Sequence, residues 1–222
     1  MGFTIGGIRE MRSGSRRRAR STEITAVAEY TGLWGWAVVP GARAVRAGSG
    51  RTDCSCGADD CPAPGAHPLA FAGELAPGTT WETAAAAWAE TPGAALLLPV
   101  GRSFDILDVP EAAGRNALAR LERMGLPLGP AAVTPTGRAL FFVAPGAAKE
   151  LPDLLYRMGW DDATLDLRSL GPGDHITAPP SDLGGHGPVR WLRPPTLDTA
   201  AHPPQARLVV GTLAYVCNRS AA

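Results

Sequence analysis

The sequence predicts an α+β fold, with mixed or antiparallel sheets flanked by helices and one zinc-stapled loop. Two observations predict the class. Segments with apolar residues at helical spacing are interspersed with short apolar runs typical of strands. Several of these runs are joined by short turns containing Gly or Pro, which indicates hairpins. The loop is predicted from three cysteines and a histidine between Cys54 and His67.

The first half of the chain contains two predicted helices and three predicted strands. Thr22 or Ser21 is the candidate cap of the first helix, and Thr79 or Thr80 of the second. The last two strands are expected to be buried and to meet at a turn at Gly101. In order, we expect a helix over 22–36, a strand over 36–41, a helix over 79–90, and strands over 93–101 and 103–110.

The second half continues with helices and short strands. Gly125 is a typical helix stop, and Pro203 and Pro204 are expected in the first turn of the closing helix. In order, we expect a helix over 111–125, strands over 131–136 and 138–145, a helix over 149–159, strands over 163–169, 175–181 and 189–192, and a helix over 203–220.

Composition excludes several classes of protein. The net charge is zero, so the total implies no strongly acidic or basic partner. No apolar run approaches the ~20 residues of a membrane helix, so we expect no membrane partner. Three of the four cysteines lie within eight residues, unlike a disulfide framework, which favours a reducing cytoplasm.

The charge is concentrated at the start of the chain. Segment 1–21 holds six arginines against Glu10, and no apolar stretch of a secretory signal follows. A solvated flexible arm explains this composition. Contact of Arg16, Arg17 and Arg18 with nucleic-acid phosphates is the alternative.

The cysteine loop has the spacing Cys54-x-Cys56-x4-Cys61-x5-His67. Three thiolates and an imidazole complete a tetrahedral zinc site, and four protein ligands indicate a structural metal. A loop rich in Gly, Pro and Asp gains order from such an ion. Free thiols in a flexible loop are the alternative. Cys217, in an apolar segment, is expected to be a buried small hydrophobe.

A strand ending in "FDILDVPE" carries Asp105 and Asp108. Two carboxylates two residues apart at a strand end would hold divalent metal for nucleotidyl transfer. Here Pro110 follows Asp108 at that spacing, so the pair is broken. Asp108 could equally be a turn former at the end of the strand.

The order of several motifs resembles the N-terminal domain of bifunctional DNA primase/polymerases, in the archaeo-eukaryotic primase superfamily. The resemblance covers about residues 30–195. The motifs are "GWAVVPG", the cysteine loop, "LLLPVG…ILDVPEAAG", "TPTGRALFFV", "LDLRS…HITAPPS" and "VRW".

The resemblance implies three catalytic elements: an hhhDxD strand that binds metals, a histidine after a T-x-S-G-G-x turn that contacts phosphates, and a later acidic residue. Asp108 matches the first aspartate and Asp166 the later acid. Thr134, Thr136 and Gly137 match the turn, with Arg138 beside it. Pro179, Pro180 and Ser181 match the PPS segment, and Arg168 follows Asp166.

Two of these elements are incomplete. Pro110 stands in place of the second aspartate and Leu140 in place of the histidine. Glu111 is expected to start a helix and to point away, and the direction of His175 is open. The domain is therefore expected to be a degenerate member, needing Mg²⁺ or Mn²⁺ only if it is active.

Simpler structural roles exist for several of these residues. Asp166 and Arg168 could pair with each other on one strand face. Trp36 and Trp191 are expected in the core rather than as base-stacking platforms. His186 is expected in an exposed loop.

Three functions follow, in order of preference. The first is an inactive domain that binds nucleic acid or a nucleotide through Thr136, Gly137, Arg138, Arg168, His175, Ser181 and the arm. The second is a regulatory module that binds a protein partner and no nucleotide. The third is an active polymerase using Asp108 and Asp166 with rearranged ligands. The expected organisation is an arm (1–21), a domain (22–198) with its zinc loop (53–68), and a C-terminal helix (199–222).

Overall fold

The computed structural model describes residues 23–46, 52–160 and 164–221. The arginine-rich arm, with Arg16, Arg17 and Arg18, lies outside these residues, so its role stays a prediction. None of the described helices has both the length and the apolar character needed to cross a bilayer.

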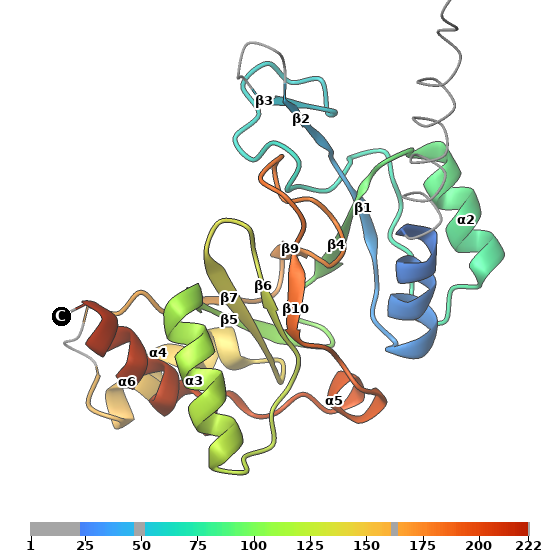
Figure 1. Cartoon of the computed structure of the whole chain (residues 1–222). Coiled ribbons are helices and arrows are strands. Elements are labelled where there is room, and N and C mark those ends of the chain that lie inside the picture. Colours follow the sequence, from blue (N-terminus) through green and yellow to red (C-terminus); the bar gives the residue numbers. More distant parts are fainter. Residues whose placement is uncertain (1–22, 47–51, 161–163, 222) are drawn as a thin grey trace, which may run out of the picture.

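Two antiparallel sheets form the centre of the molecule (Figure 1). The larger sheet has five strands in the order β10-β6-β7-β5-β8, and the smaller has three in the order β1-β4-β9. Each strand pair within the described ranges is antiparallel, which confirms the predicted α+β class. The strands are β1 (Val39–Gly41), β4 (Ala95–Pro99), β5 (Asp105–Pro110), β6 (Ala131–Val133), β7 (Arg138–Val143), β8 (Arg168–Leu170), β9 (His175–Thr177) and β10 (Arg190–Arg193).

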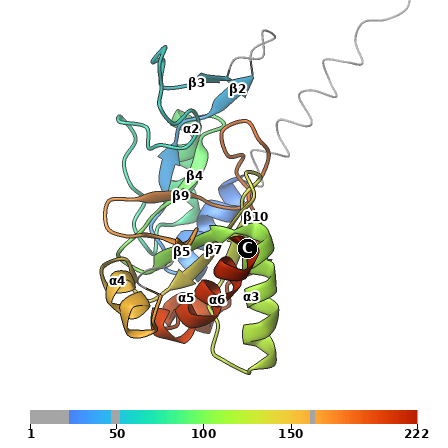
Figure 2. The same cartoon turned by 90° about the vertical axis from the view of Figure 1, so that its left-hand side faces the viewer.

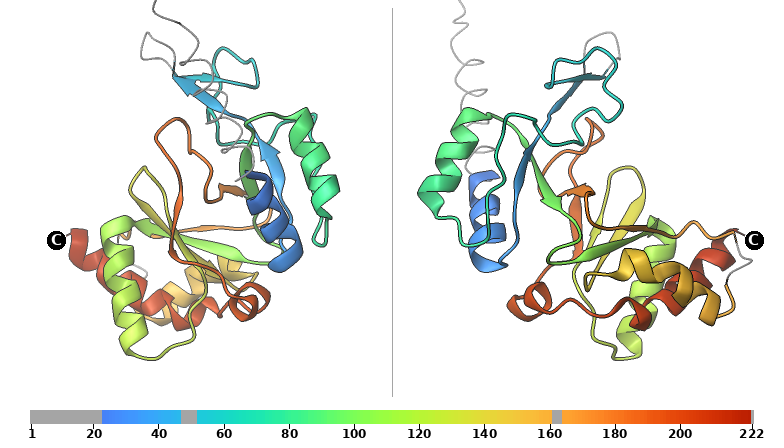
Figure 3. Two further views of the ribbon diagram at one scale, coloured as in Figure 1. Left: turned by 45° about the vertical axis from the view of Figure 1, so that its right-hand side comes forward. Right: turned by 180° about the vertical axis from the view of Figure 1, so that it is seen from behind.

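Helices flank both sheets. A helix over 23–28 continues into the π turn η1 (Glu29–Leu33) and lies near α2 (Trp81–Glu90), beside the smaller sheet (Figure 3). The cap of α2 is Thr80, whose hydroxyl accepts from the Thr83 amide. The other helices are α3 (Glu111–Arg123), α4 (Ala147–Arg157), α5 (Leu197–Ala201), the 3₁₀ turn η2 (Ala206–Leu208) and α6 (Val210–Ala221).

The alternation of side chains along β5 separates two cores. Ile106 belongs to a core that joins the two sheets, together with Leu98 of β4 and Phe142 of β7. Leu107 and Val109 face the opposite way, into a core formed with α3, α4 and α6. Asp108 has the parity of Ile106, so its side chain lies on the face away from these three helices.

A two-stranded ribbon carries the cysteine loop. It consists of β2 (Ala44–Arg46) and β3 (Thr52–Cys54), which the sequence did not predict as strands. The ribbon and the helices α3, α4 and α6 lie at opposite ends of the molecule (Figure 2).

The structure refines one predicted detail and corrects two others. β4 and β5 are buried, as expected, and a turn containing Gly101 joins them, but they lie in different sheets. Gly101 has φ 95°, and a Cβ there would lie 2.5 Å from the Pro172 backbone, so the turn directs the chain to a second sheet.

The closing helix begins later than expected. α6 starts at Val210, and Pro203 and Pro204 precede η2. The Pro204 carbonyl accepts from the Ala144 amide at 2.8 Å, just beyond β7, so this segment is held in an irregular conformation against the sheet.

The strand expected over 163–169 is short. β8 begins at Arg168, the first residue that pairs with β5, and Asp166 precedes it. Residues 161–163 lie outside the described part of the chain.

Candidate functional site

Asp108 lies within a row of residues that crosses the larger sheet. The partners in register are Trp191 with Ala132, Ala132 with Leu140, Leu140 with Asp108, and Asp108 with Arg168. Directly opposed residues of antiparallel strands share a face. Asp108 is therefore flanked by Leu140, where the resemblance implies a histidine, and by Arg168, a predicted phosphate contact.

Arg138 bonds to both predicted carboxylates. Its Nε donates to Asp108 Oδ1 at 2.7 Å, and its two terminal nitrogens donate to Asp166 Oδ2 and Oδ1 at 2.6 and 2.9 Å. Only 13% of the Asp108 side chain and 18% of the Arg138 side chain are exposed, against 50% of Asp166. The guanidinium thus lies between the two acids as a fixed cation.

This arrangement changes the protonation equilibria of Arg138 and Asp166. The hydrogen bonds from Arg138, opposed by partial burial, lower the pKa of Asp166 below its usual value. The same bonds to Asp166, followed by those to Asp108, raise the pKa of Arg138. Both shifts favour the charged forms, so Arg138 and Asp166 stabilise each other as ions.

These residues do not fit a two-metal site. Such a site needs several carboxylate oxygens open to the ions. Asp108 Oδ1 and both oxygens of Asp166 already accept from Arg138. Across the described ranges, a group of three or more Cys, His, Asp or Glu ligands occurs only in the cysteine loop.

The turn that presents Arg138 is ordered by its threonines. Thr134 Oγ1 accepts from the Arg138 amide at 3.1 Å and contacts Thr136 Oγ1 at 2.9 Å. Gly137 has φ 78°, a backbone conformation that other residues rarely adopt. Thr136 and Gly137 are exposed, so this turn is open to a ligand.

The two substituted positions offer no donor or ligand. Pro110 ends β5 opposite Arg138 and precedes α3. Leu140 is 5% exposed and belongs to the core between the sheets. Glu111 begins α3, as expected, and its carboxylate pairs with Arg115 at 2.7 Å.

Two other predicted residues lie apart from this cluster. His175 is on β9 of the smaller sheet, opposite Pro99. Ser181 is buried, and its Oγ accepts from the Leu96 amide at 2.8 Å, which attaches the PPS segment to β4. Arg168, by contrast, is 66% exposed and contacts Asp166 at 3.7 Å.

The cysteine loop brings its four predicted ligands together. The Sγ atoms of Cys54, Cys56 and Cys61 and a ring nitrogen of His67 all lie within 4.8 Å of one another. Cys54 Sγ is 3.3 Å from His67 Nε2, near the roughly 3.5 Å between ligands of a tetrahedral zinc ion. His67 Nδ1 lies 2.9 Å from the Pro68 carbonyl, which suits a tautomer with Nε2 free for a metal. The predicted site could therefore hold a metal ion.

The loop also favours a thiolate. Burial acts to raise the pKa of Cys54, but hydrogen bonds from the Cys56 and Gly65 backbone and from the His67 and Cys56 side chains lower it to about 6.

Gly65 has φ 70°, and a Cβ there would meet the Ala44 backbone nitrogen at 2.6 Å. A glycine is thus required where the loop passes β2.

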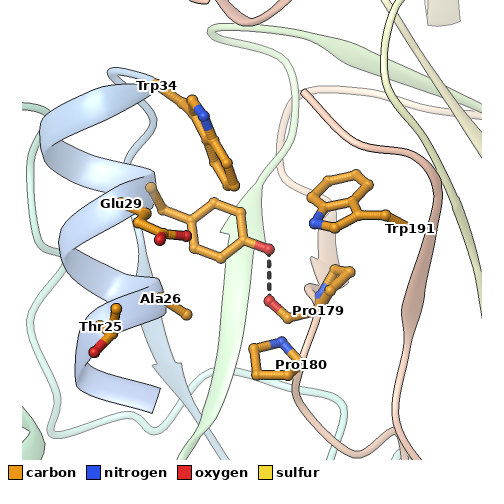
Figure 4. Close-up of a pocket in the computed structure, with 8 residues that line it drawn as sticks. Thr25, Ala26, Glu29, Trp34, Pro179, Pro180 and Trp191 are labelled. Atoms are coloured by element: carbon orange, nitrogen blue, oxygen red, sulfur yellow. Dashed lines mark hydrogen bonds between the residues drawn. The ribbon is translucent and has the colours of Figure 1, made fainter. Parts of the chain in front are cut away.

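An aromatic pocket of about 370 Å³ lies between the first helix and the PPS segment (Figure 4). Tyr30 reaches across it and donates a hydrogen bond to the Pro179 carbonyl at 2.5 Å. Trp34 and Trp191 line the pocket and are half-buried. Trp36 is 2% exposed, which confirms its predicted place in the core, whereas Trp191 packs on that core and also faces the pocket.

Two features of the site were not inferred from the sequence. The pairing of Arg138 with both acids was missed, although an arginine at the second glycine of the T-x-S-G-G-x turn was a visible departure. Asp105 was treated only as a strand residue. It is fully buried and accepts from the Gly146 and Ala148 amides at the start of α4.

Taken together, the antiparallel sheets, the Asp108–Arg138–Asp166 cluster and the separate Cys/His loop define an α+β protein with a charged cluster on its larger sheet and a possible metal site. The chain matches the family model "Bifunctional DNA primase/polymerase, N-terminal" over residues 27–206, and it belongs to this family. No curated protein and no solved structure matches it.

Proposed function

We propose that the chain is a Prim-Pol domain that no longer transfers nucleotides and that binds nucleic acid or a nucleotide. The observation that carries this proposal is the guanidinium of Arg138 between Asp108 and Asp166. Family membership supports the ligand class, because the name of the family describes primases and polymerases.

Loss of catalysis follows from the charge of the site. Nucleotidyl transfer depends on divalent ions held by carboxylates. A metal ion at Asp108 would have to displace a bound arginine, and Pro110 supplies no second carboxylate. Leu140 supplies no donor for a triphosphate.

Binding is supported by the surface around this cluster. Arg168 is largely exposed and contacts Asp166, which also pairs with Arg138 at the end of the exposed turn of Thr136 and Gly137. Arginine side chains bind phosphates by charge and by paired hydrogen bonds, without reading the base sequence.

Zinc is the metal we propose for the cysteine loop. A set of three cysteines and one histidine is typical of structural zinc, and all four ligands come from this chain. The ion would hold the loop on the β2–β3 ribbon, because the described side chains of the ribbon and loop are exposed or half-buried.

Fluorescence anisotropy with a labelled single-stranded oligonucleotide tests binding, using the chain with and without residues 1–21. We expect affinity to fall steeply with salt. Arg168→Gln should reduce the slope of log K against log salt by about one. The matched control is Arg157→Gln, an exposed arginine on α4, which should leave the slope unchanged.

Primer extension with Mg²⁺ or Mn²⁺ tests the loss of catalysis. We expect no extended product. Extension that disappears in Asp108→Ala would overturn the inactive assignment and favour an active polymerase with rearranged ligands.

A protein-interaction module is the second candidate. The observation that favours it is Phe71, which is 76% exposed shortly after the cysteine loop. Absence of any oligonucleotide or nucleotide binding by the chain without residues 1–21 would favour this candidate over the first.

A further inference from the structure

Three arginines from two helices surround one surface pocket of about 400 Å³. Arg120 and Arg123 project from α3, and Arg219 projects from α6. Tyr215 and Asn116 complete the polar part of the lining. All three arginines are exposed, so the pocket is open to solutes.

The ring of Tyr215 organises two of the guanidinium groups. Arg120 Cζ lies 4.8 Å from the ring centroid and Arg219 Cζ lies 6.0 Å from it, both within cation–π range. Arg219 also donates to Tyr215 Oη at 3.3 Å. This hydrogen bond, strengthened by the charges of Arg219 and Arg120, lowers the pKa of Tyr215.

No carboxylate balances these charges within the part of the chain that the structure describes. The acids of α3 are paired elsewhere: Glu111 with Arg115, and Glu122 with Arg193. The helix dipole stabilises an arginine near a helix C-terminus, which accounts for the position of each of these residues taken alone. It does not explain why charges from two helices converge on one hollow, where they repel one another.

We propose that this pocket binds a terminal phosphate group, either free phosphate or the phosphate of a phosphomonoester. Such a group carries a charge of about −1.5 to −2 at neutral pH and three acceptor oxygens. Guanidinium groups bind phosphate through paired, charge-assisted hydrogen bonds. The amide of Asn116 adds one more donor at the rim.

The pocket is separate from the Arg138 cluster. None of Asp108, Arg138 and Asp166 lines the pocket. α3 and α6 pack on the face of the larger sheet that carries Leu107 and Val109, and Asp108, which alternates with them along β5, has the opposite direction. α6 contacts the cluster through Cys217, whose Sγ lies 3.8 Å from the Asp166 carbonyl. The inference therefore does not depend on what the Arg138 cluster binds. Free phosphate, a nucleotide and the 5′-phosphorylated end of a strand share the required chemistry.

Isothermal titration calorimetry with the full chain tests the proposal. The probes are inorganic phosphate, a nucleoside monophosphate, and one short oligonucleotide with either a 5′-phosphate or a 5′-hydroxyl. We expect Arg120→Gln and Arg219→Gln each to weaken binding of phosphate-bearing probes about tenfold or more. Arg115→Gln, on the same helix but paired with Glu111, is the matched control and should bind as the wild type does.

The probes also separate the sources of the phosphate. Tighter binding of the 5′-phosphate strand than of the 5′-hydroxyl strand, lost in Arg120→Gln, identifies a strand end. Tighter binding of the monophosphate than of inorganic phosphate identifies a nucleotide, and equal binding identifies free phosphate. The 5′-hydroxyl strand reports on the Arg138 cluster, and its binding should not change in Arg120→Gln.

Two results would overturn the proposal. One is absence of binding by every phosphate-bearing probe. The other is an equal loss in Arg115→Gln and Arg120→Gln, because this would show a general charge effect. Thermal unfolding of each variant confirms that the compared proteins are folded.

Discussion

Arg138 Nε donates a 2.7 Å hydrogen bond to the carboxylate of Asp108, which is almost buried beneath it. The two residues lie on neighbouring strands, β7 and β5, where the family pattern has a glycine and a metal-binding aspartate. An internal cation thus accompanies an acid that the family pattern assigns to metal ions.

Arg138→Leu should destabilise the protein by about 3 kcal/mol, because it leaves a nearly buried carboxylate without its partner. Chemical denaturation measures the change in the free energy of unfolding. Arg115→Leu breaks an exposed pair and should cost under about 1 kcal/mol. Equal losses in the two variants would contradict the structural role of Arg138.

The pKa of Asp166 should rise toward the ordinary value of about 3.9 in Arg138→Leu. In the wild type it is lowered, so the pair contributes stability at pH values above the ordinary value. That contribution is lost as the pH falls through the lower, folded-state pKa. Carboxyl NMR titration measures both values, and Arg115→Leu should leave the Asp166 titration unchanged.

Purified protein should contain about one zinc ion per chain, and Cys61→Ser should lose most of it. Elemental analysis gives the content. Cys217→Ala is the matched control, because Cys217 is buried against α3 and α4 and is not among the four clustered ligands. Substoichiometric metal in both the wild type and Cys61→Ser would remove the zinc assignment.

Asp105→Ala should destabilise the protein by about 2–4 kcal/mol, since two backbone amides at the start of α4 lose a buried acceptor. Asp105→Asn keeps one acceptor oxygen and should cost less. Asp153→Ala, at an exposed position of α4, should change stability by under about 0.5 kcal/mol. Denaturant midpoints rank the three variants, and a neutral Asp105→Ala would refute the capping role.

Ser181→Ala should cost about 1–2 kcal/mol because the Leu96 amide stays buried without its acceptor. Nucleotide and oligonucleotide affinity should not change. A selective loss of affinity at unchanged stability would instead support the predicted ligand contact of Ser181.

Local patterns predicted the parts of the fold that local chemistry determines. The apolar spacing and Gly125 stop predicted α3 almost to the residue, and Thr80 caps α2 as expected. The predicted start of α6 was wrong because a tertiary hydrogen bond holds Pro204 next to the end of β7. The separation of β4 and β5 into two sheets is likewise a long-range property, which neither strand encodes alone.

The residues of the candidate sites also fall into those that local sequence predicts and those that only the fold brings together. The four residues of the cysteine loop are close in sequence, so spacing alone predicted their cluster. Arg138 and Asp166 are 28 residues apart, and only the pairing of β7, β5 and β8 brings them together. Residue identity indicated which side chains matter, but not which of them bond to one another.

The position of Leu140 determines what a histidine would contact at this point of the sheet. A buried leucine at the centre of the sheet is now part of the hydrophobic core, beside Ala132 and facing the smaller sheet. An imidazole placed there would lose its hydration, and Asp108, the residue opposite it on β5, already accepts from Arg138, so Leu140→His should cost roughly 1–3 kcal/mol. The position of the histidine in the family pattern is thus occupied in this chain by a side chain that helps to join the two sheets.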